Sequence, residues 1–105
     1  MSNLDGWLKV LEEERQKAIA RIKENFKDER LAKLYLRFIE ISYEDAKIYL
    51  GIMAEKDYPL SPTLEEVNDY GKGNENYNFL CTHVGNHLAR IRLAHKKTEE
   101  DLLLY

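Results

Sequence analysis

The amino-acid sequence predicts an all-α protein, an antiparallel bundle of three long helices plus one short helix. Strong helix formers dominate the stretch between Trp7 and Leu50, which contains neither glycine nor proline. Apolar residues recur there at intervals of three or four, as they do along one face of a helix. Three helices of about 22 residues would each be roughly 33 Å long, and helices of equal length suit an antiparallel bundle.

The first helix is predicted from an apolar stripe that only Arg15 interrupts. The stripe is lost across "KDER", and Asp28 is suited to cap a new helix, so we predict a break near Lys27. The residues of the stripe are Leu4, Leu8, Leu11, Ala18, Ile22 and Phe26.

The central helix, predicted over about Glu29 to Leu50, carries two apolar stripes with a narrow polar strip between them. A helix that is apolar around most of its circumference is expected to be covered on two sides. One stripe comprises Leu31, Leu34, Tyr35, Phe38, Ile41 and Ile48; the other comprises Ala32, Leu36, Ile39, Tyr43, Ala46, Leu50 and Met53.

Pro59 and Pro62 end this helical pattern. The short helix is predicted in "SPTLEEVNDYG", where Thr63 and Glu66 have the spacing of a capping box and Gly71 is a natural stop. A third long helix is predicted from near Asn76, with one face made of Tyr77, Leu80, Cys81, Val84, Leu88, Ile91 and Ala94.

Composition limits the class of protein. A chain of 105 residues predicts a single domain over residues 1–105, and a net charge of −3 is too small to attract nucleic acid or membranes in general. The sequence shows no signal-peptide pattern and no run of about 18 apolar residues. A lone Cys81 cannot form an internal disulfide. We therefore expect a cytoplasmic protein without a cofactor.

A metal site is one interpretation of "CTHVGNHLARIRLAHKK", which holds Cys81 and all three histidines. His83 and His87 are four residues apart, so on a helix they share a face and could bind one ion. The alternative is that His87 flanks the core, His83 faces water and Cys81 packs as a small apolar residue.

The segment "RIRLAH", from Arg90 to His95, resembles the Arg-x4-His motif of HEPN domains, which are small helical bundles. The resemblance implies a metal-independent ribonuclease in which His95 moves a proton and Arg90 binds phosphate at a dimer interface. The alternative is a basic helix end that offsets the helix dipole. We favour this alternative, and we expect no specific DNA binding and RNA binding only if the ribonuclease interpretation holds.

The leading hypothesis is a non-catalytic protein that binds another protein or itself. Motifs for nucleophilic catalysis and phosphate binding are absent from the sequence, and three helices do not readily cover so much apolar surface. Tyrosine suits interfaces because it combines apolar contact with a polar group. The predicted partner-binding residues are Tyr58, Tyr70, Tyr77, Leu103 and Tyr105, the last two in a C-terminal "DLLLY" that is expected to dock on its own bundle or on a second copy.

Overall fold

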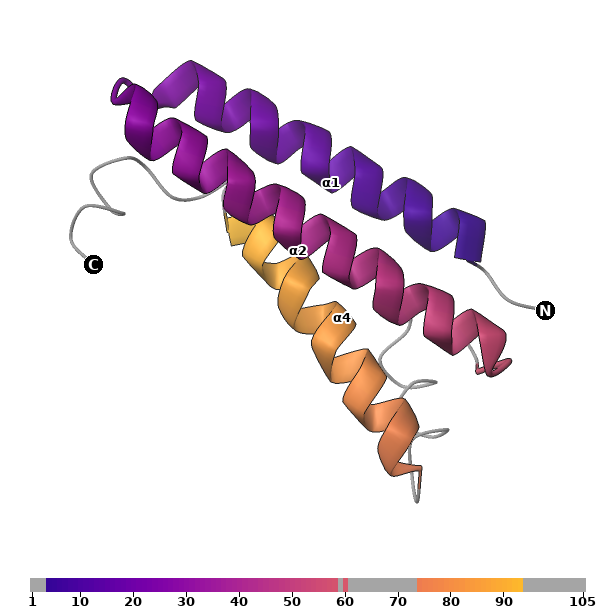
Figure 1. Ribbon diagram of the computed structural model, residues 1–105. Helices are drawn as coiled ribbons and strands as arrows, with labels where there is room; N and C mark the ends of the chain where they lie inside the picture. Colours follow the sequence, from indigo (N-terminus) through magenta and orange to yellow (C-terminus); the bar gives the residue numbers. More distant parts are fainter. Residues whose placement is uncertain (1–3, 59, 61–73, 94–105) are drawn as a thin grey trace.

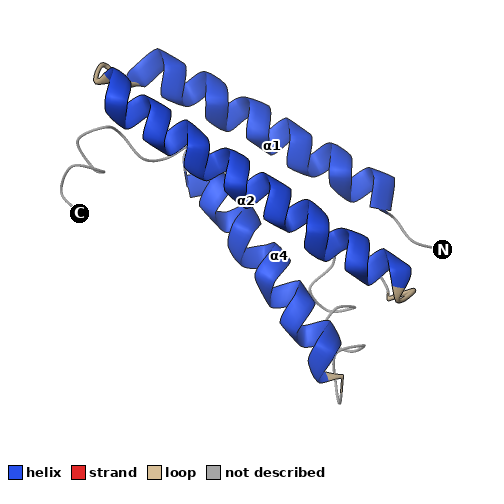
Figure 2. Ribbon diagram, in the orientation of Figure 1, coloured by secondary structure: helices blue, strands red, loops and turns tan. Residues whose placement is uncertain are grey.

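The structure, a computed structural model, describes residues 4–58, 60 and 74–93. Three helices occupy these residues: α1 (Leu4–Asn25), α2 (Glu29–Glu55) and α4 (Glu75–Leu93). No strand occurs in this part of the chain (Figure 2), so the predicted all-α class is confirmed for it. The short helix predicted within residues 61–71 lies outside the described residues.

The break between α1 and α2 falls where the sequence predicts it. α1 ends at Asn25, and the carboxylate of Asp28 accepts hydrogen bonds from the backbone N–H groups of Arg30 at 2.9 Å and Leu31 at 3.2 Å. These donors would otherwise lack a partner in the first turn of α2, so Asp28 fixes the start of that helix.

α2 is longer than predicted, because it continues beyond Leu50 to Glu55. The backbone N–H of Asp57 donates to Ala54 and that of Tyr58 donates to Met53, which is the hydrogen-bond pattern of a Schellman motif. Asp57 has a φ of 57° at the position that glycine usually takes. The stop is therefore made by an aspartate in the left-handed conformation.

α4 begins one residue before the predicted Asn76, at Glu75. The side-chain oxygen of Asn74 accepts a hydrogen bond from the backbone N–H of Tyr77 at 3.0 Å and so caps the helix. α1 and α2 lie side by side along most of their length, whereas α4 crosses α2 at an angle (Figure 1).

The core lies between the three helices in two clusters. The smaller cluster joins Ala18 and Ile22 of α1 to Ile39 of α2 and Ile91 of α4. The larger cluster consists of Leu11, Ala46, Leu50, Met53, Leu60, Tyr77, Leu80, Val84 and Leu88. The indole N–H of Trp7 donates to the carbonyl of Leu60 at 3.0 Å, which ties the chain beyond α2 back to the start of α1.

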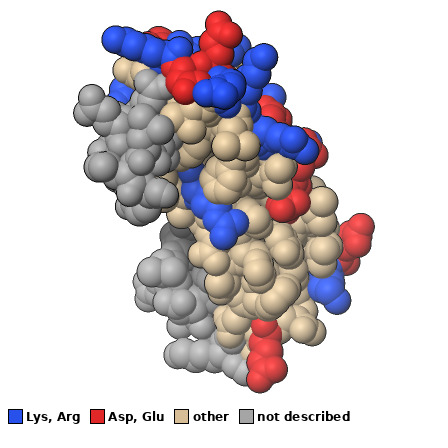
Figure 3. Space-filling model, turned by 60° about the vertical axis from the view of Figure 1, so that its left-hand side comes forward, with Lys and Arg blue, Asp and Glu red and all other residues tan. Residues whose placement is uncertain are grey.

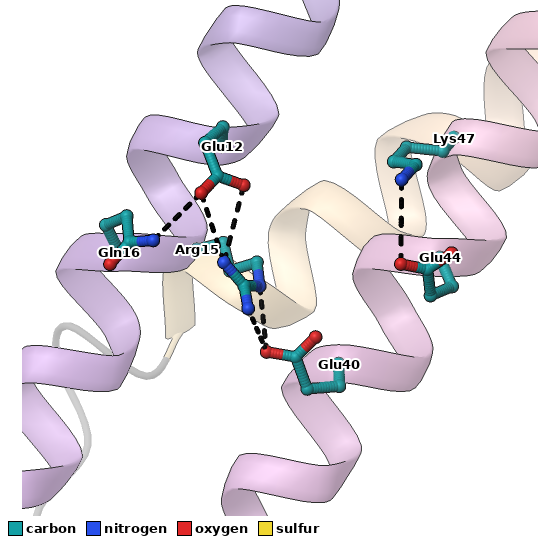
Figure 4. A network of polar contacts seen from close by, with 6 residues as sticks. All are labelled: Glu12, Arg15, Gln16, Glu40, Glu44 and Lys47. Atoms are coloured by element: carbon teal, nitrogen blue, oxygen red, sulfur yellow. Dashed lines mark hydrogen bonds and ion pairs between the residues drawn. The ribbon is translucent and has the colours of Figure 1, made fainter.

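Arg15, which interrupts the apolar stripe of α1, joins that helix to α2. Its guanidinium lies 2.7 Å from the Glu40 carboxylate and 3.1 Å from that of Glu12, and Gln16 also donates to Glu12 (Figure 4). The same guanidinium stands 5.1 Å from the centre of the Tyr43 ring. A cation is accommodated in the α1–α2 contact because two carboxylates and an aromatic face surround it.

The Arg15–Glu40 pair is expected to contribute a coupling free energy of about 0.5–1 kcal/mol, since both side chains are partly exposed to water. A double-mutant cycle with Arg15→Met and Glu40→Gln, followed by urea unfolding, measures it. The Glu44–Lys47 pair within α2, at 3.6 Å, is the control and should give a smaller value. Equal coupling in the two cycles would contradict a specific role for Arg15.

Asp57→Gly is expected to raise the free energy of unfolding by about 0.5–1 kcal/mol, because glycine adopts positive φ without the clash of a Cβ. Asp57→Ala is the matched control, since it removes the same carboxylate but keeps a Cβ. Urea unfolding measures both variants. If alanine stabilises as much as glycine, the gain comes from lost charge and not from backbone conformation.

Candidate functional site

One face of α2 presents large apolar side chains to solvent. The exposed fractions are 66% for Leu34, 40% for Phe38, 52% for Ile41 and 58% for Ile48. These residues, together with the half-buried Leu31, form what we call the exposed seam. The sequence predicted cover on two sides of α2, but α1 and α4 bury only the stripe that contains Ile39, Ala46 and Leu50 among the described residues.

A groove of about 470 Å³ runs over the first half of the exposed seam. It is lined by Leu31, Leu34, Tyr35, Arg37, Phe38 and Ile41. The rings of Phe26, Tyr35 and Phe38 follow one another with centroids 5.8 Å apart at each step and support one wall. The lining offers apolar contact and a single guanidinium, so it suits apolar side chains of a partner and not bond-making chemistry.

The sequence indicated the pattern of the exposed seam but not its exposure. Its apolar residues were identified as a stripe, and the partner-binding residues were sought instead among tyrosines and the C-terminus. Periodicity shows that a face is apolar, whereas its exposure depends on where the neighbouring helices lie.

Of the predicted partner-binding tyrosines, Tyr77 is fully buried in the larger core cluster. Tyr58 packs against it edge to face, with ring centroids 5.4 Å apart. Tyr77 therefore offers no surface to a partner and seals one end of the core, while Tyr58 is half-buried beside it. Tyr70, Leu103 and Tyr105 lie outside the described residues.

His83 and His87 share one face of α4, as their spacing predicts, and both stack on Tyr49 of α2. The ring centroids lie 4.9 Å and 5.8 Å from that of Tyr49. The ring of Phe79 approaches that of His83 at 4.3 Å. No group of three His, Cys, Asp or Glu side chains that could hold a metal ion occurs among the described residues. The stack accounts for both imidazoles as packing between α2 and α4.

Two further polar groups of α4 are shaped by burial. Desolvation lowers the pKa of His87, and the nearby guanidinium of Arg90 lowers it further, against an opposing effect of Asp45. One Arg90 guanidinium nitrogen lies 3.4 Å from His87 Nδ1. Burial also raises the pKa of the Cys81 thiol, which packs against the larger core cluster as the sequence suggested.

The two residues of the HEPN-like motif cannot be compared directly, because His95 lies outside the described residues. Arg90 is exposed on α4, where its guanidinium lies beside His87. Arg92 of the same basic run forms an ion pair with Glu14 of α1 at 3.7 Å. One cation of the run is therefore used within the fold.

The described surface carries mixed charge. Cations and anions are interspersed around the face drawn in Figure 3, and uncharged side chains fill much of its middle. No helix in the described ranges has the length and apolar character needed to cross a membrane. These observations direct attention to the exposed seam as the candidate site.

Lowering the pH from about 7.5 to 5.5 is expected to destabilise the fold through His87. Because its pKa is lower in the folded than in the unfolded chain, the unfolded state binds more protons below about pH 6.5, and stability falls with pH. Thermal unfolding should show a smaller loss for His87→Gln than for the wild-type protein. His83→Gln, from the same ring stack, is the control, and an undiminished loss in His87→Gln would contradict this assignment.

A scan of protein-family models, a search of curated proteins and a search of solved structures each found no match to this chain. Inference about function therefore starts from the side chains that the fold exposes.

Proposed function

We propose that this chain is a non-catalytic helical module that binds another protein, or a second copy of itself, through the exposed seam of α2. One observation carries the proposal: Leu34, Phe38, Ile41 and Ile48 line one helix face and are each at least 40% exposed. Helix-in-groove recognition and helix pairing both use apolar anchors with this spacing.

The free energy available from covering the seam supports this proposal. Burying a large apolar side chain completely is worth about 1.5–3 kcal/mol, so several half-exposed ones provide a substantial driving force for association. Contiguous apolar patches on soluble proteins commonly mark interaction sites. The neighbouring edge of α2 carries exposed charges such as Lys33 and Glu44, so the apolar seam has a polar border.

The proposal includes the predictions about the fold and the cellular location that were made from the sequence. We take the three long helices to be an antiparallel bundle completed by the predicted short helix, in a cytoplasmic protein. The ribonuclease that uses Arg90 and His95 and the metal site at His83 and His87 stay as alternatives. Neither has support comparable to the exposed seam, because His95 lies outside the described residues and both described histidines are engaged in the Tyr49 stack.

The double variant Leu34→Ser, Ile41→Ser tests the proposal. It should abolish association, whether self-association in sedimentation velocity or retention of another protein in affinity capture. The helix content should be unchanged, because both side chains are exposed and contribute little to the core.

The matched control is Lys33→Ser on the polar edge of the same helix, which should retain all associations of the wild-type protein. The proposal is wrong if two results are obtained together. The wild-type protein does not self-associate, and every protein that it retains is also retained by the apolar double variant.

A further inference from the structure

The exposed seam has the spacing of a coiled-coil interface. Its apolar residues and Asp45 occupy positions separated alternately by three and four residues: Leu31, Leu34, Phe38, Ile41, Asp45 and Ile48. Two helices that repeat such residues every 3.5 positions pack along the whole stripe. The seam is about 26 Å long at 1.5 Å per residue, so a straight helix of similar length can cover it.

We propose that the partner of the exposed seam is α2 of a second copy of this chain, packed antiparallel about a two-fold axis. This inference rests on the proposed function, since it names the partner of the same surface. A two-fold axis makes each copy use one and the same patch, so the patch must be complementary to itself.

The spacing of the seam meets this requirement. When the axis passes midway between Phe38 and Ile41, Phe38 packs against Ile41 of the second copy, and the reverse contact follows from symmetry. In the same register Leu31 meets Ile48 of the second copy. The remaining apolar residue, Leu34, lies at the level of Asp45 of the second copy, so four of the five apolar residues of the seam face another apolar residue.

The charges beside the seam favour the antiparallel direction. The edge of α2 directly beside the seam carries Arg30 and Arg37 in its first half and Glu44 after them. In the register above, Arg37 and Glu44 of the second copy lie two residues, or about 3 Å, apart along the helix axis, within reach of their long side chains, and this pair occurs twice. A parallel arrangement would place Arg37 at the level of Arg37, and Glu44 at the level of Glu44, of the second copy, so these opposite charges would not meet.

Asp45 fixes the register. It is a half-buried carboxylate within an apolar seam, at the level of Leu34 and within a turn of Arg37 of the second copy. A polar residue in an apolar interface lowers the overall stability of the pair. It lowers the stability most in registers where it meets only apolar groups, so it favours the register that gives it a polar partner. A shift by one heptad would take it away from Arg37.

The exposed seam faces away from α1, and α4 borders it at Tyr49, on which His83 and His87 stack. Glu40 and Tyr43, which contact Arg15 of α1, lie roughly 150° around α2 from the centre of the seam at 100° per residue. α1 therefore stands behind the proposed interface. A short seam places the dimer in the small class of interfaces, so it should dissociate on dilution at roughly micromolar concentrations.

Charge reversal tests the pairing in the full-length chain. Arg37→Glu and Glu44→Arg should each weaken the dimer in sedimentation equilibrium at least tenfold, because each places like charges together. An equal mixture of the two single variants should restore association, since both cross pairs are then complementary. The double variant Arg37→Glu, Glu44→Arg should restore it within one chain, and the control Lys33→Glu should leave it unchanged.

Disulfide formation tests the direction. In a Cys81→Ser background, Leu31→Cys and Ile48→Cys chains with different tags should cross-link to each other on oxidation. Neither variant should cross-link to itself. Self-cross-linking without the mixed product would show a parallel pair and would overturn the proposal.

Other outcomes separate this proposal from the one on which it rests. A wild-type chain that stays monomeric, yet captures a different protein through Leu34 and Ile41, overturns the pairing and leaves the proposed function standing. A monomer that becomes dimeric only when residues 94–105 are deleted shows that the chain's own C-terminal segment covers the seam, which also overturns the pairing. A monomer that captures nothing contradicts both.

Discussion

The apolar surface of α2 is the constraint on which the rest of the structure depends. This helix is apolar on two faces, and a neighbour can bury only the arc that it contacts. α1 and α4 both pack on the same side, where Ile39, Ala46 and Leu50 become buried. The second face is left to solvent among the described residues, so the arrangement that builds the core also creates the candidate interface.

Polar groups fix how the helices surround α2. Arg15 binds Glu40 across the α1–α2 contact, and Trp7 holds the carbonyl of Leu60 at the other end of the bundle. Tyr49 receives both stacked histidines of α4. These contacts hold α1 and α4 on one side of α2, where Ile39 packs with Ile91 of α4, and the groove on another face of α2 remains open. Specific polar contacts therefore decide which apolar face is covered.

Local chemistry predicted much of this fold from the sequence. The break near Lys27 and the cap at Asp28 could be predicted because an acidic capping residue precedes a new series of regularly spaced apolar residues. The stripe of α2 that is buried could be predicted from the spacing of its apolar residues. The end of α2 was missed because Asp57 adopts a conformation that a glycine would have signalled. The exposure of the seam and the stacking on Tyr49 depend on the relative placement of helices, which periodicity alone does not determine.

The central claim is that the exposed seam becomes buried when the protein acts. Fluorine NMR of protein labelled with 4-fluorophenylalanine measures this directly, because the shift difference between H₂O and D₂O reports solvent contact at each ring. Phe79, 57% exposed on α4, is the internal reference for Phe38. The account predicts that Phe38 loses its solvent-isotope shift in the associated state and that Phe79 keeps it. A solvent-isotope shift at Phe38 that persists in the associated state would contradict the account.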